Sequence, residues 1–384
     1  MQRSLAIITH EYYPVLSGGT IFTHKLAEEL SRIGWSVDVL TARIGPDHQA
    51  VEHGPPFDVY RFSTARSSVS DSTLLEHIGY FALGLPQMLA RARSRRYDLL
   101  FSVFAIPSGL IGLAISKLLR VPCVVFVDAA DTPGVESAMK TYVRHLASVF
   151  RLVTNRASGV VVLEGLEDLA MPHIRHRRTT SIPNGTDIPA RRARPNENGD
   201  SLQLLSVGRL VLRKGFQTIL QALAIVQKAR DDFHLRIVGY GRAEDEIRRA
   251  LEQNQVADKV TLLGRVEYAE LGSYYLGSDA YLFYGDREGS SLAMIEAAAY
   301  GLPIVASDHP GNRTYVEHER SGMLVPYTGA EPLAAALLQL LEHRDRLASM
   351  GERSRQIAER YSWARVAKQY DAFFSRILET LDQA

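Results

Sequence analysis

Residues 284–308 read YGDREGSSLAMIEAAAYGLPIVASD, and the rest of the chain is organised around this stretch. Its pattern predicts the end of a strand, a loop, a helix and the next strand. The segment 291–300 is apolar on nearly every side, which is typical of a helix packed inside a layered domain. Glu296 is the one charged residue in that segment, and no basic residue lies three or four positions away to neutralise it. A buried carboxylate needs hydrogen-bond donors, so we expect either a ligand with paired hydroxyls at Glu296 or a side chain turned to solvent at a gap in the packing.

Glu288 lies on the loop that enters this helix, eight residues before Glu296. Small residues follow it at the helix start, namely Gly289, Ser290 and Ser291. The free backbone N–H groups and the positive end of the helix dipole can hold an anion such as a diphosphate there. The helix rises about 7.5 Å over five residues, so one ligand with sugar, diphosphate and ribose can span the two glutamates.

These residues resemble the signature of a known family, the retaining GT-B glycosyltransferases of family four, also called group 1. The signature has the form EGxGLxxxEAxAxGxPVVAS, and this chain reads EGSSL at 288–292, EA at 296–297 and GLPIVAS at 301–307. The pair Ser290 and Ser291 departs from the small or aromatic pair usual in the family. The resemblance implies α/β architecture, with two Rossmann-like domains facing a cleft, and transfer of a sugar from a nucleotide-diphosphate donor with retention of configuration.

The resemblance also assigns roles to residues of this stretch. It implies that Glu288 holds hydroxyls of the donor sugar and that Glu296 holds the ribose hydroxyls. The other expected donor-binding residues here are Gly289, Ser290, Ser291 and Leu292. The donor would be a UDP-sugar or a GDP-sugar, and the acceptor a small molecule, a glycan or a lipid-linked group.

Length and composition fit such an enzyme. The chain has 384 residues, a length sufficient for two domains. Its formal net charge is +1 and 23% of its residues are charged, so the charge does not favour nucleic acid as a partner. The single Cys123 lies in the apolar run 121–127, as a buried small hydrophobe does, and cannot form an internal disulfide. The apolar core at residues 5–9 is too short for a signal peptide, and no stretch approaches 18 apolar residues. We therefore expect a cytoplasmic protein, soluble or peripheral at the inner face of a membrane.

Short apolar runs alternate with helical patterns along the chain, which predicts two doubly wound parallel sheets. We expect domains at 1–190 and 200–366, joined by the polar stretch 189–201. The resemblance implies that a terminal helix, about 367–384, crosses back to the first domain. The expected strands are 5–9, 37–40, 98–103, 123–127, 160–163 and 179–182 in the first half, and 202–207, 235–238, 260–263, 280–283, 304–306 and 323–325 in the second.

Two cations follow the first strand of the second half. Arg209 and Lys214 stand between that strand and the next helix, and Gly208 precedes them. They are either solvated loop charges or a clamp for a diphosphate, and the family's paired Arg and Lys motif falls on these positions. No Asp-x-Asp ends a strand, so we expect no metal. No cofactor is expected either, because nothing marks Lys228 or Lys259 as a pyridoxal phosphate lysine.

A glycine turn follows the next strand. Gly239 and Gly241 fit the start of a nucleotide fingerprint, but Glu244 stands where a dinucleotide-binding fold has its third glycine. The resemblance implies that this turn lines the nucleotide pocket and that the backbone near Val266 reads the base.

The first half has its own glycine turn, HEYYPVLSGGT at residues 10–20. Gly18 and Gly19 precede a helix, where a phosphate or acceptor group can rest, or they form a flexible turn without a ligand. The resemblance implies that this loop faces the donor. Residues 184–187, NGTD, match a family turn whose expected role is structural, at the junction of the domains.

Asp128 and Asp131 end a strand of the first half, and many family members have a His where Asp128 stands. The two carboxylates either orient an acceptor hydroxyl or amine, which makes them catalytic candidates, or cap the following turn.

A run of arginines, Arg91, Arg93, Arg95 and Arg96, either touches anionic lipid or forms a solvated helix face.

Three other functions are alternatives to the transferase: a GT-B phosphorylase, a sugar-nucleotide epimerase, or a non-catalytic subunit that binds a sugar nucleotide.

Overall fold

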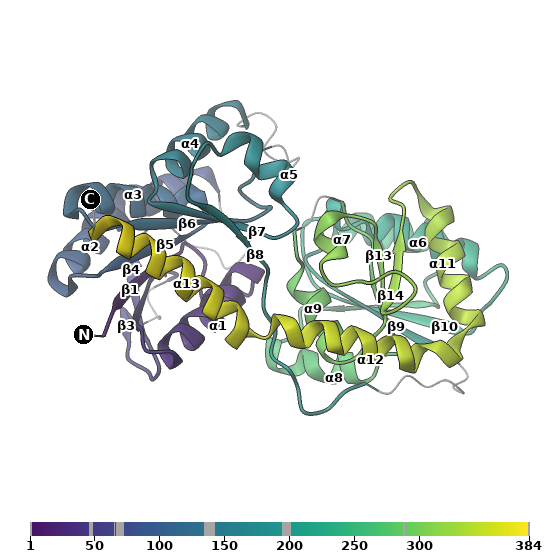
Figure 1. Cartoon of the computed structure of the whole chain (residues 1–384). Coiled ribbons are helices and arrows are strands. Elements are labelled where there is room, and N and C mark those ends of the chain that lie inside the picture. Colours follow the sequence, from purple (N-terminus) through teal and green to yellow (C-terminus); the bar gives the residue numbers. More distant parts are fainter. Residues whose placement is uncertain are drawn as a thin grey trace. The chain divides into compact units, whose positions relative to one another are not determined.

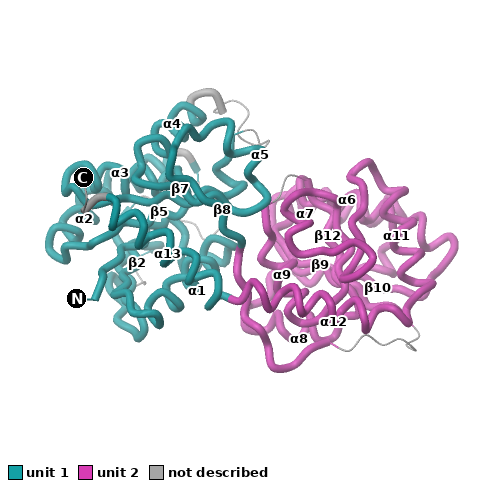
Figure 2. Tube along the Cα trace, in the orientation of Figure 1, with its two compact units in different colours: residues 1–183, 363–384 teal, residues 184–362 magenta. Residues whose placement is uncertain are grey.

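The computed structural model describes residues 2–45, 49–64, 66, 73–133, 143–193, 201–286 and 289–382. The chain divides into two compact units, residues 1–183 with 363–384 and residues 184–362 (Figure 2). Each unit contains one sheet with helices packed on it (Figure 1). Glu288 lies outside the described residues.

Unit 1 is built on an eight-stranded sheet in the described part of the chain, with the order β3-β4-β2-β1-β5-β6-β7-β8. All neighbouring strands pair in parallel except β3, which is antiparallel to β4. Every residue of β1, β5, β6 and β7 is buried, as expected for central strands covered on both faces. The strands are β1 Ser4–Ile8, β2 Ser36–Arg43, β3 Val51–Glu52, β4 Asp58–Ser63, β5 Leu99–Val103, β6 Cys123–Val127, β7 Gly159–Leu163 and β8 Thr179–Ile182.

The helices of unit 1 include the last helix of the chain. Trp35 donates from Nε1 to Oδ1 of Asp371 at 2.8 Å, and the ring of Phe22 lies 6.1 Å from that of Trp363. These contacts hold α13 against α1, which confirms that the terminal helix returns to the first domain. The helices are α1 Gly18–Arg32, α2 Leu74–Arg95, η1 Ala105–Gly109, α3 Leu110–Leu119, α4 Val143–Arg156, α5 Glu167–Ala170, η3 Met171–His173 and α13 Trp363–Asp382.

Among its described residues, unit 2 contains a six-stranded parallel sheet with the order β11-β10-β9-β12-β13-β14. Its two faces bury separate apolar clusters, since the successive residues Leu204 and Leu205 belong to different ones. This confirms the second doubly wound parallel sheet. The strands are β9 Leu202–Val207, β10 Phe233–Val238, β11 Val260–Gly264, β12 Ala280–Phe283, β13 Ile304–Ser307 and β14 Gly322–Val325.

Helices connect the strands of unit 2 and cover its sheet (Figure 1). They are η4 Leu212–Lys214, α6 Phe216–Val226, α7 Glu244–Gln253, η5 Tyr268–Glu270, α8 Leu271–Leu276, α9 Leu292–Ala299, α10 Pro310–Arg313, α11 Ala330–Glu342, η6 Arg344–Arg346, α12 Leu347–Ala358 and η7 Glu359–Tyr361.

The chain passes from unit 1 to unit 2 at Pro183 and Asn184, before the polar stretch 189–201. The described start of that stretch packs on unit 2. The backbone N–H of Ala193 donates to the carbonyl oxygen of Tyr300 at 2.7 Å, and Arg355 donates to the carbonyl oxygen of Pro189 at 2.7 Å. Residues 189–193 therefore belong to the second unit.

Candidate functional site

Three expected donor-binding glycines meet at the carboxyl-terminal edge of the unit 2 sheet. Gly208 follows β9, and Gly239 follows the neighbouring strand β10 with a φ of +152°. A Cβ atom at Gly239 would lie 1.9 Å from the carbonyl oxygen of Gly208, and one at Gly241 would lie 2.5 Å from that of Leu210. The two loops can therefore approach this closely only because these positions are glycine.

Lys214 lies at the same edge, at the end of η4. Its Cε would be 3.8 Å from a Cβ atom at Gly208, and its Nζ lies 5.1 Å from the centre of the Phe283 ring at the end of β12. The backbone N–H of Asp286 donates to the carbonyl oxygen of Arg213 at 2.9 Å. The loop after β9 thus rests against the loop after β12, which leads to α9. The exposed Arg209 directly follows Gly208.

The loop before α9 is fixed by a residue distant in sequence. Ser290 is buried and accepts the backbone N–H of Asn184 on its Oγ at 3.1 Å. The side-chain amide of Asn184 donates to the carbonyl oxygen of Ser290 at 2.5 Å. Ser291 occupies the N-cap position of α9, which begins at Leu292, and its side chain makes no capping hydrogen bond. The first-turn N–H groups of α9 are therefore not covered by the side chain at the cap.

Glu296 receives its hydrogen bonds from two tyrosines. Tyr268 donates to Oε1 at 2.8 Å, and Tyr275 donates to Oε2 at 2.9 Å. The ring of Tyr300 stacks on that of Tyr275, with centroids 5.1 Å apart. Burial, together with the nearby Glu296 carboxylate, raises the pKa of Tyr275 well above its usual value, so Tyr275 remains a donor. The two tyrosines therefore fix the orientation of the Glu296 carboxylate.

The partners of Glu296 were not evident in the sequence. Tyr268 and Tyr275 lie 28 and 21 residues before Glu296 and share no helix with it.

Val266, expected near the base, is partly buried against the apolar cluster on the α9 face of the sheet.

The glycine turn of unit 1 lies between β1 and α1. Ser17 is the N-cap of α1; its Oγ accepts the backbone N–H of Thr20 at 3.1 Å and donates to Oε2 of Glu11 at 2.7 Å. Gly18 is the first residue of the helix. A Cβ atom at Gly19 would come within 2.7 Å of the Phe104 ring, which follows β5. The turn therefore sits at the carboxyl-terminal edge of the unit 1 sheet.

Asp131 ties two strand ends together. Its Oδ1 accepts the backbone N–H of Asp128 at 3.0 Å, and its Oδ2 accepts that of Ala105, after β5. Burial raises the pKa of Asp131 to about 8, and the neighbouring Asp128 carboxylate adds to the increase. The carbonyl oxygen of Asp128 accepts the hydroxyl of Thr132 at 2.7 Å. These bonds are those of a turn cap, and Asp128 as a residue is partly exposed.

The described residues contain no group of three or more His, Cys, Asp or Glu side chains placed to hold a metal ion. Within the same residues, no helix has the length and apolar character that crossing a membrane requires.

The architecture is that of the GT-B class of glycosyltransferases: two α/β units, each built on a largely parallel sheet, and a terminal helix that returns to the first unit. The family described as Glycosyl transferases group 1 matches residues 187–357, and the Glycosyl transferase 4-like domain matches residues 17–185. The chain belongs to the group 1 glycosyltransferases.

Relatives with assigned activities match to different extents. The amylovoran biosynthesis glycosyltransferase AmsK of Erwinia amylovora is 37% identical over 145 residues, which are 36% of each chain. The D-inositol 3-phosphate glycosyltransferase of Pseudarthrobacter chlorophenolicus is 26% identical over 377 residues, 91% of this chain and 88% of that protein. The present chain thus spans about a third of the first relative and most of the second.

Solved structures share the fold at low sequence identity. The sucrose-phosphate synthase of Thermosynechococcus elongatus matches with a TM-score of 0.85 at 22% identity, over 98% of this chain and 100% of that one. HepE of Anabaena in complex with UDP-glucose matches with a TM-score of 0.75 at 18% identity, over 99% and 100%.

Proposed function

We propose that this glycosyltransferase moves a sugar from a nucleotide-diphosphate donor to an acceptor, with retention of configuration and without a metal ion. The observation that carries the proposal is the edge of the unit 2 sheet where Gly208, Gly239 and Lys214 meet the loop leading to α9. Glycine turns and the start of a helix whose N-cap side chain makes no capping bond suit a diphosphate, and the similar HepE structure holds UDP-glucose. UDP-sugars and GDP-sugars are both candidate donors.

The roles in this reaction follow from chemistry and position. Arg209 and Lys214 stabilise the negative charge of the departing diphosphate. Glu296, oriented by its two tyrosines, accepts the ribose hydroxyls, while Glu288 binds the donor sugar. In a front-face reaction the leaving phosphate oxygen accepts the proton of the attacking hydroxyl, so no separate general base is required. The N–H groups of Gly289 to Leu292 complete the diphosphate site.

Unit 1 supplies the acceptor side in this proposal. Gly18 and Gly19 leave the backbone of the turn after β1 accessible to a phosphate or a sugar. Asp128, a partly exposed residue, orients an acceptor hydroxyl or an ammonium group through its carboxylate. Asp131 acts through Asp128, because its carboxyl group accepts the Asp128 backbone N–H at 3.0 Å.

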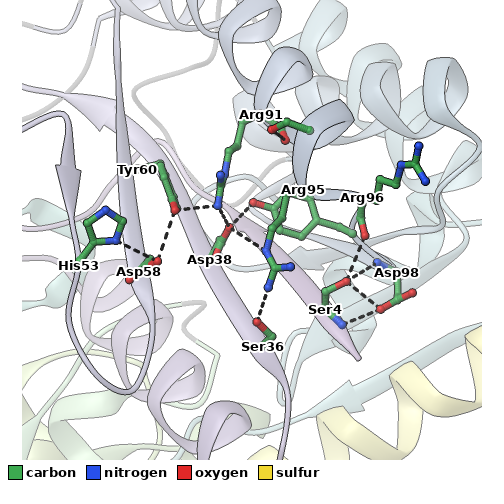
Figure 3. Close-up of polar contacts among 12 residues, drawn as sticks. Ser4, Ser36, Asp38, His53, Asp58, Tyr60, Arg91, Arg95, Arg96 and Asp98 are labelled. Atoms are coloured by element: carbon green, nitrogen blue, oxygen red, sulfur yellow. Dashed lines mark hydrogen bonds and ion pairs between the residues drawn. The ribbon is translucent and has the colours of Figure 1, made fainter. Parts of the chain in front are cut away.

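The arginine run lies at the C-terminal end of α2, with Arg96 as the C-cap. Figure 3 shows that Arg91 donates to Oδ2 of Asp38 at 2.7 Å and that Arg95 donates to Ser36, so both point toward the sheet. Arg93, Arg95 and Arg96 are exposed, whereas Arg91 is partly buried. Other exposed cations lie where the neighbouring strands β6, β7 and β8 begin: Lys117, Arg120, Arg151, Arg156, Arg175, Arg177 and Arg178.

Exposed apolar side chains accompany these cations. Leu118 is 58% exposed, Leu152 49% and Met171 43%. Cations mixed with apolar side chains suit the surface of an anionic bilayer, so we infer peripheral contact with the inner face of a membrane and a lipid-linked acceptor. Sedimentation with vesicles containing phosphatidylserine tests this contact: replacing Arg120 and Arg156 by Glu should reduce binding at least threefold, and unchanged binding would contradict it.

A thermal-shift screen of nucleotide sugars tests the donor class. A ligand present at 100 times its Kd stabilises the folded state by about 2.7 kcal/mol. We expect a clear rise in Tm with a UDP-sugar or a GDP-sugar, whereas no shift with any nucleotide sugar would contradict the proposal. Transfer or hydrolysis by the purified protein then separates an enzyme from a subunit that only binds the donor.

A further inference from the structure

The residue that starts unit 2 holds the loop that enters α9. Asn184 makes two hydrogen bonds to Ser290, through its backbone N–H at 3.1 Å and its side-chain amide at 2.5 Å. Both residues are buried, with exposed fractions of 6% and 1%. Asn184 itself is held by the Tyr315 hydroxyl, which donates to its carbonyl oxygen at 2.9 Å. The backbone N–H and the side-chain amide of Asn184 therefore hold the loop at Ser290, while Tyr315 holds Asn184.

The fixed loop is the one proposed to bind the diphosphate. Ser290 lies two residues before Leu292, where α9 begins. With its hydroxyl and its carbonyl oxygen both held by Asn184, Ser290 faces the interior, and the direction of the following N–H groups is set. Those N–H groups must point at the anion before it binds if they are to stabilise it without reorganisation.

The contact requires the amide of asparagine. An aspartate at position 184 would place a carboxylate oxygen against the carbonyl oxygen of Ser290, where two acceptors repel. Alanine would remove the donor and leave the buried carbonyl oxygen of Ser290 without this partner.

We propose that Asn184 is a positioning residue for the donor diphosphate, acting through Ser290. This inference rests on the proposed function. It adds to the expected structural role of the NGTD turn an indirect role in ordering the donor site, through Ser290.

Calorimetric titration of Asn184→Ala with UDP and GDP, and with uridine and guanosine, tests the inference. Wild-type protein should bind one of the two diphosphates. For that nucleotide, the variant should lose at least tenfold in affinity, while the affinity for the nucleoside should change less than twofold, because the nucleoside lacks the diphosphate. Asn184→Asp should lose at least as much as Asn184→Ala.

Tyr315→Phe is the matched control, because it disturbs the same buried turn while leaving both bonds from Asn184 to Ser290. It should retain diphosphate affinity within about threefold. Equal losses in Tyr315→Phe and Asn184→Ala, or equal losses for diphosphate and nucleoside, would overturn the inference. If Asn184→Ala does not fold, Ser290→Ala provides the same comparison and should show a smaller loss specific to the diphosphate. Failure of wild-type protein to bind either diphosphate would instead overturn the proposed function.

Discussion

The hydroxyl of Tyr275 donates a hydrogen bond of 2.9 Å to Oε2 of Glu296, across 21 residues of sequence. Tyr275 is fully buried, so the bond fixes one oxygen of the carboxylate, while Tyr268 fixes the other at 2.8 Å. This arrangement explains how an apolar helix tolerates a glutamate. It also holds the Glu296 carboxylate in a constant orientation.

Removing the Tyr275 hydroxyl should therefore affect both stability and binding. A hydrogen bond to a charged group contributes about 1.5–3 kcal/mol, so Tyr275→Phe should lower the free energy of unfolding by an amount in this range and weaken UDP or GDP binding severalfold. Denaturant unfolding and calorimetric titration measure the two effects. Tyr274→Phe, at the neighbouring position, is the control. A Tyr275→Phe protein with wild-type stability and affinity would contradict the role of the bond.

The two glutamates of the 284–308 stretch should separate in their effects. Glu296→Gln should weaken binding of the free nucleotide by about tenfold, or 1.4 kcal/mol, because the ribose contact exists without a sugar. Glu288→Gln should leave nucleotide affinity unchanged and reduce affinity for the sugar donor. Titration of both variants with nucleotide and with donor gives the comparison. Identical affinity profiles for the two variants would refute the assignment.

Lys214→Ala should slow transfer by roughly 10²- to 10³-fold, as removal of other preorganised charge contacts does. The reason is that Lys214 lies at the glycine edge of the unit 2 sheet, beside Gly208. Steady-state kinetics at saturating donor measure the loss, and Lys228→Ala serves as control. Normal turnover by Lys214→Ala would place the diphosphate clamp elsewhere.

Asp128→Asn should reduce transfer to the acceptor by at least about tenfold, or 1.4 kcal/mol, and leave donor hydrolysis nearly unchanged. The charge of Asp128 is proposed to act on the acceptor alone. Parallel measurements of transfer and hydrolysis separate the two. A parallel loss of transfer and donor hydrolysis would show that Asp128 serves the donor or the fold. Unchanged transfer in the variant would leave Asp128 only the role of capping the turn.

Asp131 should make stability depend on pH. Its pKa rises from 3.8 to about 8 in the folded protein, so the folded state retains a proton that the unfolded chain has already released between these values. The free energy of unfolding should therefore fall as pH rises from about 4 to 8. Asp131→Asn should flatten this slope relative to wild type, with Asp168→Asn as control. An unchanged slope in Asp131→Asn would exclude Asp131 as its source.

The sequence predicted well those features that depend on neighbouring residues. Continuous apolar runs such as 123–127 predict buried parallel strands, and parallel strands bring the glycines that follow them to one sheet edge. β4, Asp58–Ser63, escaped prediction because polar residues interrupt its apolar positions and only two of its residues are buried. Its neighbour β3 has just two residues, Val51–Glu52.

Contacts between distant residues could not be predicted in this way. Asn184 meets Ser290 across 106 residues, and Tyr268 meets Glu296 across 28. No periodicity within one helix or strand relates such pairs, because their approach depends on how the strands are ordered in the sheet.

The most direct test of the central claim is transfer by purified protein in excess EDTA, using the nucleotide sugar found in the thermal-shift screen. Proton NMR follows release of the nucleoside diphosphate. It also shows the anomeric configuration of the sugar product as it first forms, before its two anomers equilibrate. Release should continue in EDTA, the product should keep the anomeric configuration of the donor, and Glu288→Gln should abolish turnover. A strict requirement for Mn²⁺ or Mg²⁺, or a product of inverted configuration, would contradict the claim.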